Sequence, residues 1–268
     1  MNPPMYHSIG PEPLFRVASA TGGNLWPDPV LGHGAYYVGI EANRYSRPDQ
    51  LTVYCAQDPL VAITEGAFYQ ALKCQNDIAS YRMKAVSYPL QSKHLLWAFR
   101  IDPQPPVIDM ESLLASNHFA YSPHVLLNPI RMYSGTQAIA DDVRTHTPPA
   151  GSGQPRPEGL KAPSVRTPHE AGFQPHQLAL FVRDMPGSVP FDQRSQLVAK
   201  MTIEFEFFTH LPRTSVAYQH ARIDWATPRF RVTAIPGEPS LSPIPAYLGR
   251  PNARSYSLNR WYSIGIVF

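Results

Sequence analysis

Thirty prolines are spread along this chain of 268 residues, about twice the usual frequency. Proline has no backbone N–H to donate and fixes φ, so it interrupts both helices and sheets. A chain punctuated in this way is expected to form short elements joined by many loops, with few long helices. Its hydrophobic content of 43% still supplies enough apolar side chains for a substantial core.

The charge pattern narrows the kinds of ligand. Only 16% of the residues are charged, and the net charge is +3. The sequence has no dense basic stripe with interleaved aromatic residues, which disfavours nucleic-acid binding. The basic residues are mostly arginine, which binds phosphate and carboxylate groups through two parallel hydrogen bonds. This composition favours a ligand of nucleotide size.

The sequence contains no recognisable targeting or metal-binding signal. Residues 1–10 lack the apolar segment of a secretory signal, and no apolar run is long enough to predict a membrane span. Cys55 and Cys74 indicate neither a disulfide framework nor a zinc site, and the histidines lack metal-ligand spacing, so we expect no metal. We therefore expect a reduced, cytoplasmic protein, although export by a signal-less route is compatible with the same features.

The local patterns predict strands and a few helices in an irregular order. Apolar or alternating segments predict strands at 14–18, 51–56, 95–101, 177–183, 199–208, 229–235 and 261–268, with a further apolar patch at 35–40. Helices are predicted at 58–73 and 110–116, and the Pro- and Gly-rich residues 145–163 are predicted as loop. Because strands and helices do not alternate regularly, the predicted fold class is α+β.

One carboxylate lies where the 58–73 helix requires an apolar side chain. At 3.6 residues per turn, Val61, Glu65, Phe68 and Leu72 fall on a single stripe. Burying a carboxylate is costly unless it is paired, hydrogen-bonded or open to a cleft. Two interpretations follow: Glu65 lies at the rim of the helix and reaches solvent, or it is held in a pocket beside a ligand.

The residues around Glu65 resemble the RES domain, a family named for its Arg, Glu and Ser. Arg44 lies in a polar turn, Tyr54 follows ten residues later in an apolar strand, and Glu65 follows eleven residues after Tyr54. This order and spacing are those of the family. The stretch PSVR at 163–166, which precedes another apolar strand, is similar to the segment that carries the family's serine and assigns that role to Ser164.

The resemblance covers about residues 12–190, beginning with LFRV at 14–17, which is similar to the family's first strand. The glycine that usually precedes the family's arginine is Asn43 here. The sequence GAYY at 34–37 is an alternative match to this glycine-arginine-aromatic place, and in that alignment the arginine role passes to Arg16. We predict a RES-like domain over 12–208, with 145–163 as an insertion, and a β-rich extension over 209–268 of unknown role.

The resemblance implies an ADP-ribosyltransferase-like split β-sheet around an NAD-binding cleft, with short helices around it. It also implies an NAD+-degrading toxin that uses NAD+ as substrate without a further cofactor, and a separate antitoxin or immunity protein as partner. In such a site Glu65 would stabilise the positive charge that develops on the ribose as nicotinamide leaves. Arg44, or else Arg16, would hold the diphosphate. Tyr54 would stack on a ring of NAD+, and Ser164 would bond a ribose hydroxyl or a neighbouring side chain.

Each of these residues also has an ordinary explanation when it is taken alone. Tyr54 fits the core of a strand, Ser164 fits a turn after a proline, and Arg44 fits a solvated loop. Their joint occurrence at the family's spacing favours a functional site. Two other functions stay open, namely transfer of ADP-ribose to a protein or nucleic-acid target, and a non-catalytic binding module that kept the fold.

Overall fold

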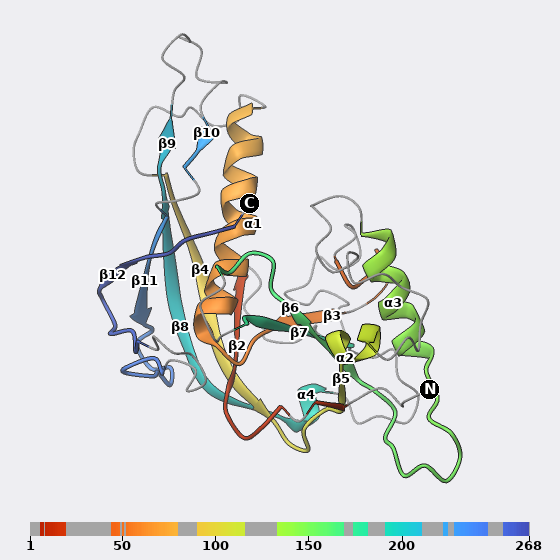
Figure 1. Cartoon of the computed structure of the whole chain (residues 1–268). Coiled ribbons are helices and arrows are strands. Elements are labelled where there is room, and N and C mark those ends of the chain that lie inside the picture. The colour runs from red at the N-terminus through yellow and green to blue at the C-terminus, as the bar shows by residue number, and fades with distance from the viewer. Residues whose placement is uncertain are drawn as a thin grey trace.

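The part of the chain described by the computed structural model forms two five-stranded sheets with helices around them (Figure 1). The described residues are 6–7, 9–19, 44–48, 50, 52–79, 90–115, 133–168, 174–181, 191–210, 222–224, 228–245 and 254–267. The predicted apolar patch at 35–40 and the alternative motif at 34–37 lie outside these ranges.

Sheet A has the strand order β1-β5-β6-β7-β3, in which β5 and β6 are parallel and the other neighbours are antiparallel. Its strands are β1 (Tyr6–His7), β3 (Thr52–Cys55), β5 (Val107–Asp109), β6 (Gly159–Pro163) and β7 (His176–Phe181).

Sheet B has the order β12-β11-β8-β4-β2 and is antiparallel throughout. Its strands are β2 (Leu14–Ser19), β4 (Leu90–Ile101), β8 (Ser195–Phe207), β11 (Arg229–Ala234) and β12 (Trp261–Ser263), and a separate pair is formed by β9 (Thr209–His210) and β10 (Arg222–Ile223). These two sheets with few helices confirm the predicted α+β class. The proposed division at residue 208 stays a prediction, but β11 and β12 complete sheet B.

The helices are α1 (Pro59–Ala79), α2 (Met110–Ala115), α3 (Ser134–Thr145) and α4 (Phe191–Arg194). Helix α1 packs on one face of sheet B, whose other face meets sheet A, and α3 covers the far face of sheet A (Figure 1). Strand β4 is therefore buried on both faces: Leu96 and Ala98 face the α1 side, whereas Leu95, Trp97 and Phe99 face sheet A. This double burial explains its continuous apolar run.

The start of α1 follows the sequence closely. Asp58 precedes Pro59, and its carboxylate accepts a hydrogen bond from the N–H of Leu60 at 2.7 Å. This contact is that of an N-cap, and proline is favoured at the first helical position, where its missing N–H would have no helical partner. The side chain of Thr64, one turn further on, is also fully buried and donates to the carbonyl of Leu60 at 2.7 Å.

The predicted end of α1 at Lys73 is wrong, because the helix continues to Ala79. Cys74 and Ile78 are buried and extend the apolar stripe by more than one turn, so packing against sheet B outweighs the C-terminal signal of one lysine. Near this end, the side chain of Gln75 accepts a hydrogen bond from the backbone of Ile223 in β10 at 2.8 Å.

Residues 145–163 are not all loop as predicted, since 159–163 form β6 in the middle of sheet A. Gly159 permits this pairing, because a Cβ atom at that position would lie 2.7 Å from the carbonyl oxygen of Ala179 in β7. Helix α3, just before this segment, was not predicted. The predicted strand at 261–268 ends at Ser263 among the described residues.

The two sheets are joined where their edge strands meet. Phe15 of β2 and Ala56, directly after β3, exchange two backbone hydrogen bonds of 2.7 and 2.9 Å. Beyond this bridge the strands diverge into separate sheets, and α1 begins three residues after Ala56. Residues from β2, β3 and the first half of α1 are therefore gathered at one junction.

Gly66 allows the close approach of α1 and β2 at this junction. A Cβ atom there would lie 2.7 Å from both Cβ and Cγ1 of Val17. We expect Gly66→Ala to lower the unfolding free energy by about 1–3 kcal/mol through overpacking, although alanine is normally the better helix former. Urea denaturation measures this change. The double variant Gly66→Ala/Val17→Ala should recover most of the loss; no recovery would contradict the steric explanation.

Candidate active site

A cavity of about 220 Å³ lies at the junction of α1, β2 and β3. Four of the five residues predicted for the site line it, namely Glu65, Arg44, Tyr54 and Arg16, and the fifth, Ser164, lies directly behind Glu65. The cavity is smaller than the 300–1,000 Å³ of typical ligand pockets. Its size suits one end of a dinucleotide.

Glu65 is held in this cavity by one short hydrogen bond. Its side chain is partly buried on α1, and its Oε1 accepts a hydrogen bond from Oγ of Ser164 at 2.6 Å. Burial raises the pKa of Glu65 above its ordinary value, while the Ser164 bond and the positive charges of Arg44 and Arg166 partly oppose this increase. The acid on the apolar stripe therefore faces a cavity.

Ser164 is the organising residue of the turn that follows β6. It is fully buried, and its Oγ accepts hydrogen bonds from the backbone N–H groups of Arg166 and Thr167 at 3.3 and 3.2 Å. Its own N–H donates to the carbonyl of Pro175 at 2.8 Å. Of the two predicted contacts for Ser164, the structure shows the one with a neighbouring side chain. Ser164 thus fixes the position of the Glu65 carboxylate.

The segment after β12 supports this turn from behind. The N–H of Val267 donates to the carbonyl of Arg166 at 2.9 Å, and a Cβ atom on Gly265 would lie 3.3 Å from Pro168. Ile264 and Ile266 are buried in the core between α1 and sheet B. Residues outside the segment that resembles the RES domain therefore contact the turn that carries Ser164.

Tyr54 and Arg44 connect the cavity to the loop before β3. The hydroxyl of Tyr54 accepts a hydrogen bond from the N–H of Tyr45 at 3.0 Å and lies 3.3 Å from Oγ of Ser46. Burial raises the pKa of Tyr54. Arg44 is buried, donates to the carbonyl of Pro163 at 3.4 Å, and its guanidinium carbon lies 5.3 Å from the centre of the Tyr45 ring. Both side chains line the cavity but are anchored by the protein itself.

Arg16 enters the cavity from β2, so both arginines considered for the family position are at the site. It is buried, and burial lowers its pKa to about 9, although the nearby Cys55 opposes this decrease. Burial raises the pKa of the Cys55 thiol to about 12. Cys55 therefore remains a neutral thiol at neutral pH, which makes it a poor nucleophile.

Several residues of the cavity were not assigned a role from the sequence. Arg166 belongs to the PSVR stretch, where the sequence assigns a role to Ser164 alone. Tyr69 lies one helical turn after Glu65, so its place on the same side of α1 could have been inferred from periodicity. Tyr133 and Gln177 also line the cavity, and no local pattern distinguishes them.

The cavity has a positive character. The charged residues among those that line it within the described ranges are three arginines and one glutamate, which gives a net charge of +2 when Glu65 is ionised. Such a pocket favours a ligand with anionic groups, and Glu65, when ionised, supplies the one negative charge among these lining residues.

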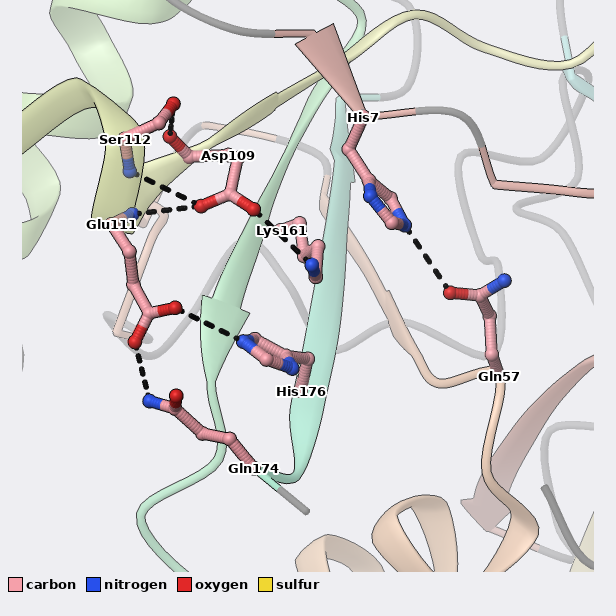
Figure 2. A network of polar contacts seen from close by, with 8 residues as sticks. All are labelled: His7, Gln57, Asp109, Glu111, Ser112, Lys161, Gln174 and His176. Carbon is pink, nitrogen blue, oxygen red and sulfur yellow. Dashed lines mark hydrogen bonds and ion pairs between the residues drawn. The ribbon is translucent and has the colours of Figure 1, made fainter. Parts of the chain in front are cut away.

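A second polar network lies on sheet A and serves the fold (Figure 2). Asp109 caps α2 by accepting hydrogen bonds from the N–H groups of Glu111 and Ser112 at 2.9 and 3.3 Å, and it pairs with Lys161 at 3.1 Å. Burial alone would raise the pKa of Asp109, but Lys161 and the two N–H donors lower it below its ordinary value. The carboxylate is thus stabilised in its charged form.

Two histidines extend this network toward its ends. His176 lies 3.4 Å from Glu111, and His7 lies 3.4 Å from the side-chain oxygen of Gln57 (Figure 2). Burial and the charge of Lys161 lower the pKa of both histidines, which favours their neutral forms. The contacts of Asp109 link α2, β5 and β6, that of His176 links β7 to α2, and that of His7 links β1 to the segment after β3. None of these residues is among the described residues that line the cavity.

Among the described residues, no group of three or more His, Cys, Asp or Glu side chains is arranged to hold a metal ion. Cys55 and Cys74 are both free and buried. The described helices include none with the length and apolar character needed to cross a membrane.

The fold and the cavity define an α+β protein with an acid and a group of arginines at the junction of two sheets. A family model described as the RES domain matches residues 13–198, which is most of the chain. The chain belongs to the RES-domain family, as the motifs indicated.

Among solved structures, the chain is similar to one in the MbcT–MbcA toxin–antitoxin complex of M. tuberculosis. The identity is 12% and the TM-score 0.43, and the match covers 71% of this chain and 83% of the other. No curated protein matches the chain.

Proposed function

We propose that this protein is an NAD+-degrading toxin that cleaves the bond between nicotinamide and ribose, as a glycohydrolase or a phosphorylase. The observation that carries the proposal is the carboxylate of Glu65, held by Ser164 in a cationic cavity. Membership of the RES family supports it, since the resemblance implies this activity and an ADP-ribosyltransferase-like cleft.

The proposed reaction begins with departure of nicotinamide. The bond between C1′ of the ribose and the nicotinamide nitrogen breaks, and its electron pair goes to nicotinamide, which leaves as a neutral molecule. The ribose acquires positive charge, which an ionised Glu65 stabilises more strongly in the transition state than in the ground state. An oxygen of water or phosphate then bonds to C1′, and the water route releases one proton.

Each further residue has a role that its contacts support. Ser164 keeps the Glu65 carboxylate in one position, which reduces the reorganisation needed during the reaction. Tyr54 presents its ring in the cavity wall, where a nicotinamide or adenine ring can stack. Arg44 and Arg16 add positive charge that favours binding of a phosphate-containing ligand.

Nicotinamide release from NAD+ by the purified protein, with and without inorganic phosphate, tests the proposal. We expect ADP-ribose in phosphate-free buffer if water is the acceptor, and a strict dependence on phosphate if the enzyme is a phosphorylase. Absence of both nicotinamide release and NAD+ binding would refute the proposal. Transfer of ADP-ribose to an added protein or nucleic acid, without free ADP-ribose, would favour the transferase alternative, and NAD+ binding without turnover would favour a non-catalytic module.

The resemblance to the RES family also implies a protein partner. We propose that a separate antitoxin chain covers the cavity, because an unmasked NAD+-degrading enzyme would deplete its own cell. Expression in bacteria should lower cellular NAD+ and stop growth, and co-expression of the antitoxin should restore both. Normal growth at high expression of soluble protein would contradict this view.

A further inference from the structure

Arg166 is held at the cavity by an aromatic contact of its side chain and by hydrogen bonds of its backbone. The residue is only 7% exposed, it lines the cavity, and its guanidinium carbon lies 3.8 Å from the centre of the Phe68 ring. Its backbone is fixed on both sides, because its N–H donates to Ser164 Oγ and its carbonyl accepts from Val267. Stacking on an aromatic face leaves the edge of a guanidinium, where its N–H groups point, available for other partners.

The guanidinium of Arg166 has donors that the described residues do not use. Within the described ranges, no side chain or carbonyl accepts a hydrogen bond from it. Arg144 provides the contrast, since it lies 3.9 Å over the ring of Phe181 but donates to the hydroxyl of Thr52 at 2.5 Å and to the carbonyl of Tyr45 at 3.4 Å. Buried arginines normally donate to acceptors of the protein, as Arg144 does through Nη2.

The carboxylate of Glu65, which attracts Arg166, is hydrogen-bonded to another residue. The carboxylate of Glu65 attracts Arg166, but it accepts its hydrogen bond from Ser164 and forms no ion pair with Arg166 within 4.0 Å. Arg44, the other cation beside Glu65, donates to the carbonyl of Pro163. Arg166 is thus the arginine of the cavity whose guanidinium is best placed to receive an anionic group of a ligand.

We propose that Arg166 is a phosphate-binding residue of this cavity. Its planar group of donors matches the oxygens of a phosphate, and the +2 charge of the lining suits an anion more than the neutral carboxamide of nicotinamide. Two sources of phosphate are available to the proposed reaction, which are the diphosphate of NAD+ and a free phosphate ion acting as acceptor. The identity of these two sources rests on the proposed function, whereas the proposal that Arg166 binds phosphate does not.

Direct binding measurements test the role of Arg166 in phosphate binding independently of catalysis. Isothermal titration of the full chain with inorganic pyrophosphate and with inorganic phosphate gives two dissociation constants. We expect Arg166→Gln to raise at least one of these dissociation constants by about 10- to 100-fold, which corresponds to the loss of a charge-assisted hydrogen bond. Arg166→Lys should raise the same constant less. Arg231→Gln is the matched control, because Arg231 also lies over an aromatic ring, Trp261, but donates to Glu204 on sheet B.

Kinetics then separate the two sources. A rise in the KM for NAD+ in phosphate-free buffer, with kcat nearly unchanged, identifies the diphosphate; a rise in the KM for phosphate alone identifies the acceptor. A fall in kcat with both KM values unchanged would show a structural role and overturn the proposal. So would equal anion binding by wild type and Arg166→Gln, or no anion binding by wild type. A third outcome is possible: the wild type binds anions but does not cleave NAD+, and Arg166→Gln no longer binds anions. This result would refute the proposed function but support the phosphate site.

Discussion

Replacing Glu65 by glutamine is expected to abolish nicotinamide release and, at neutral pH, to make the folded protein more stable. The activity falls because the amide carries no charge to stabilise the positive ribose, and the loss should be at least about 1,000-fold, as for other removed electrostatic stabilisers. The amide keeps the size of the side chain and can still accept the hydrogen bond from Ser164. Liquid chromatography of nicotinamide measures the loss.

The gain in stability follows from the raised pKa of Glu65. Because the pKa is higher in the folded protein than in the unfolded chain, the contribution of Glu65 to stability is fully present below the unfolded value and is lost as the pH rises through the folded value. At neutral pH, where Glu65 is ionised in the unfolded chain, the raised pKa of the folded protein therefore costs stability, and glutamine removes this cost. The difference should disappear below about pH 4, where both states are protonated.

Urea denaturation of both proteins across this pH range measures the difference. Glu204→Gln is the control, since Glu204 lies on sheet B and pairs with Arg231, so its loss should leave nicotinamide release unchanged. A Glu65→Gln variant that retains activity within about tenfold of wild type would refute the catalytic role. A variant less stable than wild type at neutral pH would refute the electrostatic cost.

Replacing Ser164 by alanine is expected to shift the acid side of the pH–rate profile to higher pH. The hydrogen bond from Ser164 lowers the pKa of Glu65, so its removal raises that pKa further. A higher pH is then needed to ionise Glu65. At a pH where Glu65 of the variant is still ionised, the rate should fall by about 10- to 100-fold, because the carboxylate loses its fixed position.

The same variant should be less stable by about 1–3 kcal/mol, because the N–H groups of Arg166 and Thr167 lose their acceptor in a buried turn. Ser112→Ala is the control. Its hydroxyl donates to the carbonyl of Asp109 at 3.0 Å in the separate network on sheet A, so it should leave the pH–rate profile unchanged. If the profile of Ser164→Ala superimposes on that of wild type, Ser164 does not tune Glu65.

The parts of the fold predicted from sequence are those with strong local signals. The cap at Asp58, the proline after it and the apolar strand before it place the start of α1 within one residue. The stripe on α1 and the spacing to Tyr54 then identify Glu65 as exceptional. The approach of Ser164 to Glu65, 99 residues away in the chain, is a tertiary contact that only the family motif could suggest.

The parts that were missed depend on tertiary contacts. Strand β6 is bracketed by Gly159 and Pro163, which locally favour a loop, yet its pairing with β5 and β7 determines its structure. Helix α3 has only a short apolar stripe, formed by Ile139, Ala140 and Val143 against sheet A. The sequence does not reveal the place of Arg166 for the same reason, because its packing against Phe68 joins two segments that are far apart in the chain.

The hydrogen bond between Val267 and Arg166 has a consequence for protein synthesis. A nascent chain on the ribosome carries Glu65 and Ser164 long before Val267 is added, so until then the turn beside Glu65 lacks this support. The segment that carries Ser164 therefore emerges first, and the hydrogen bond that supports its turn can form only once residue 267 has been synthesised.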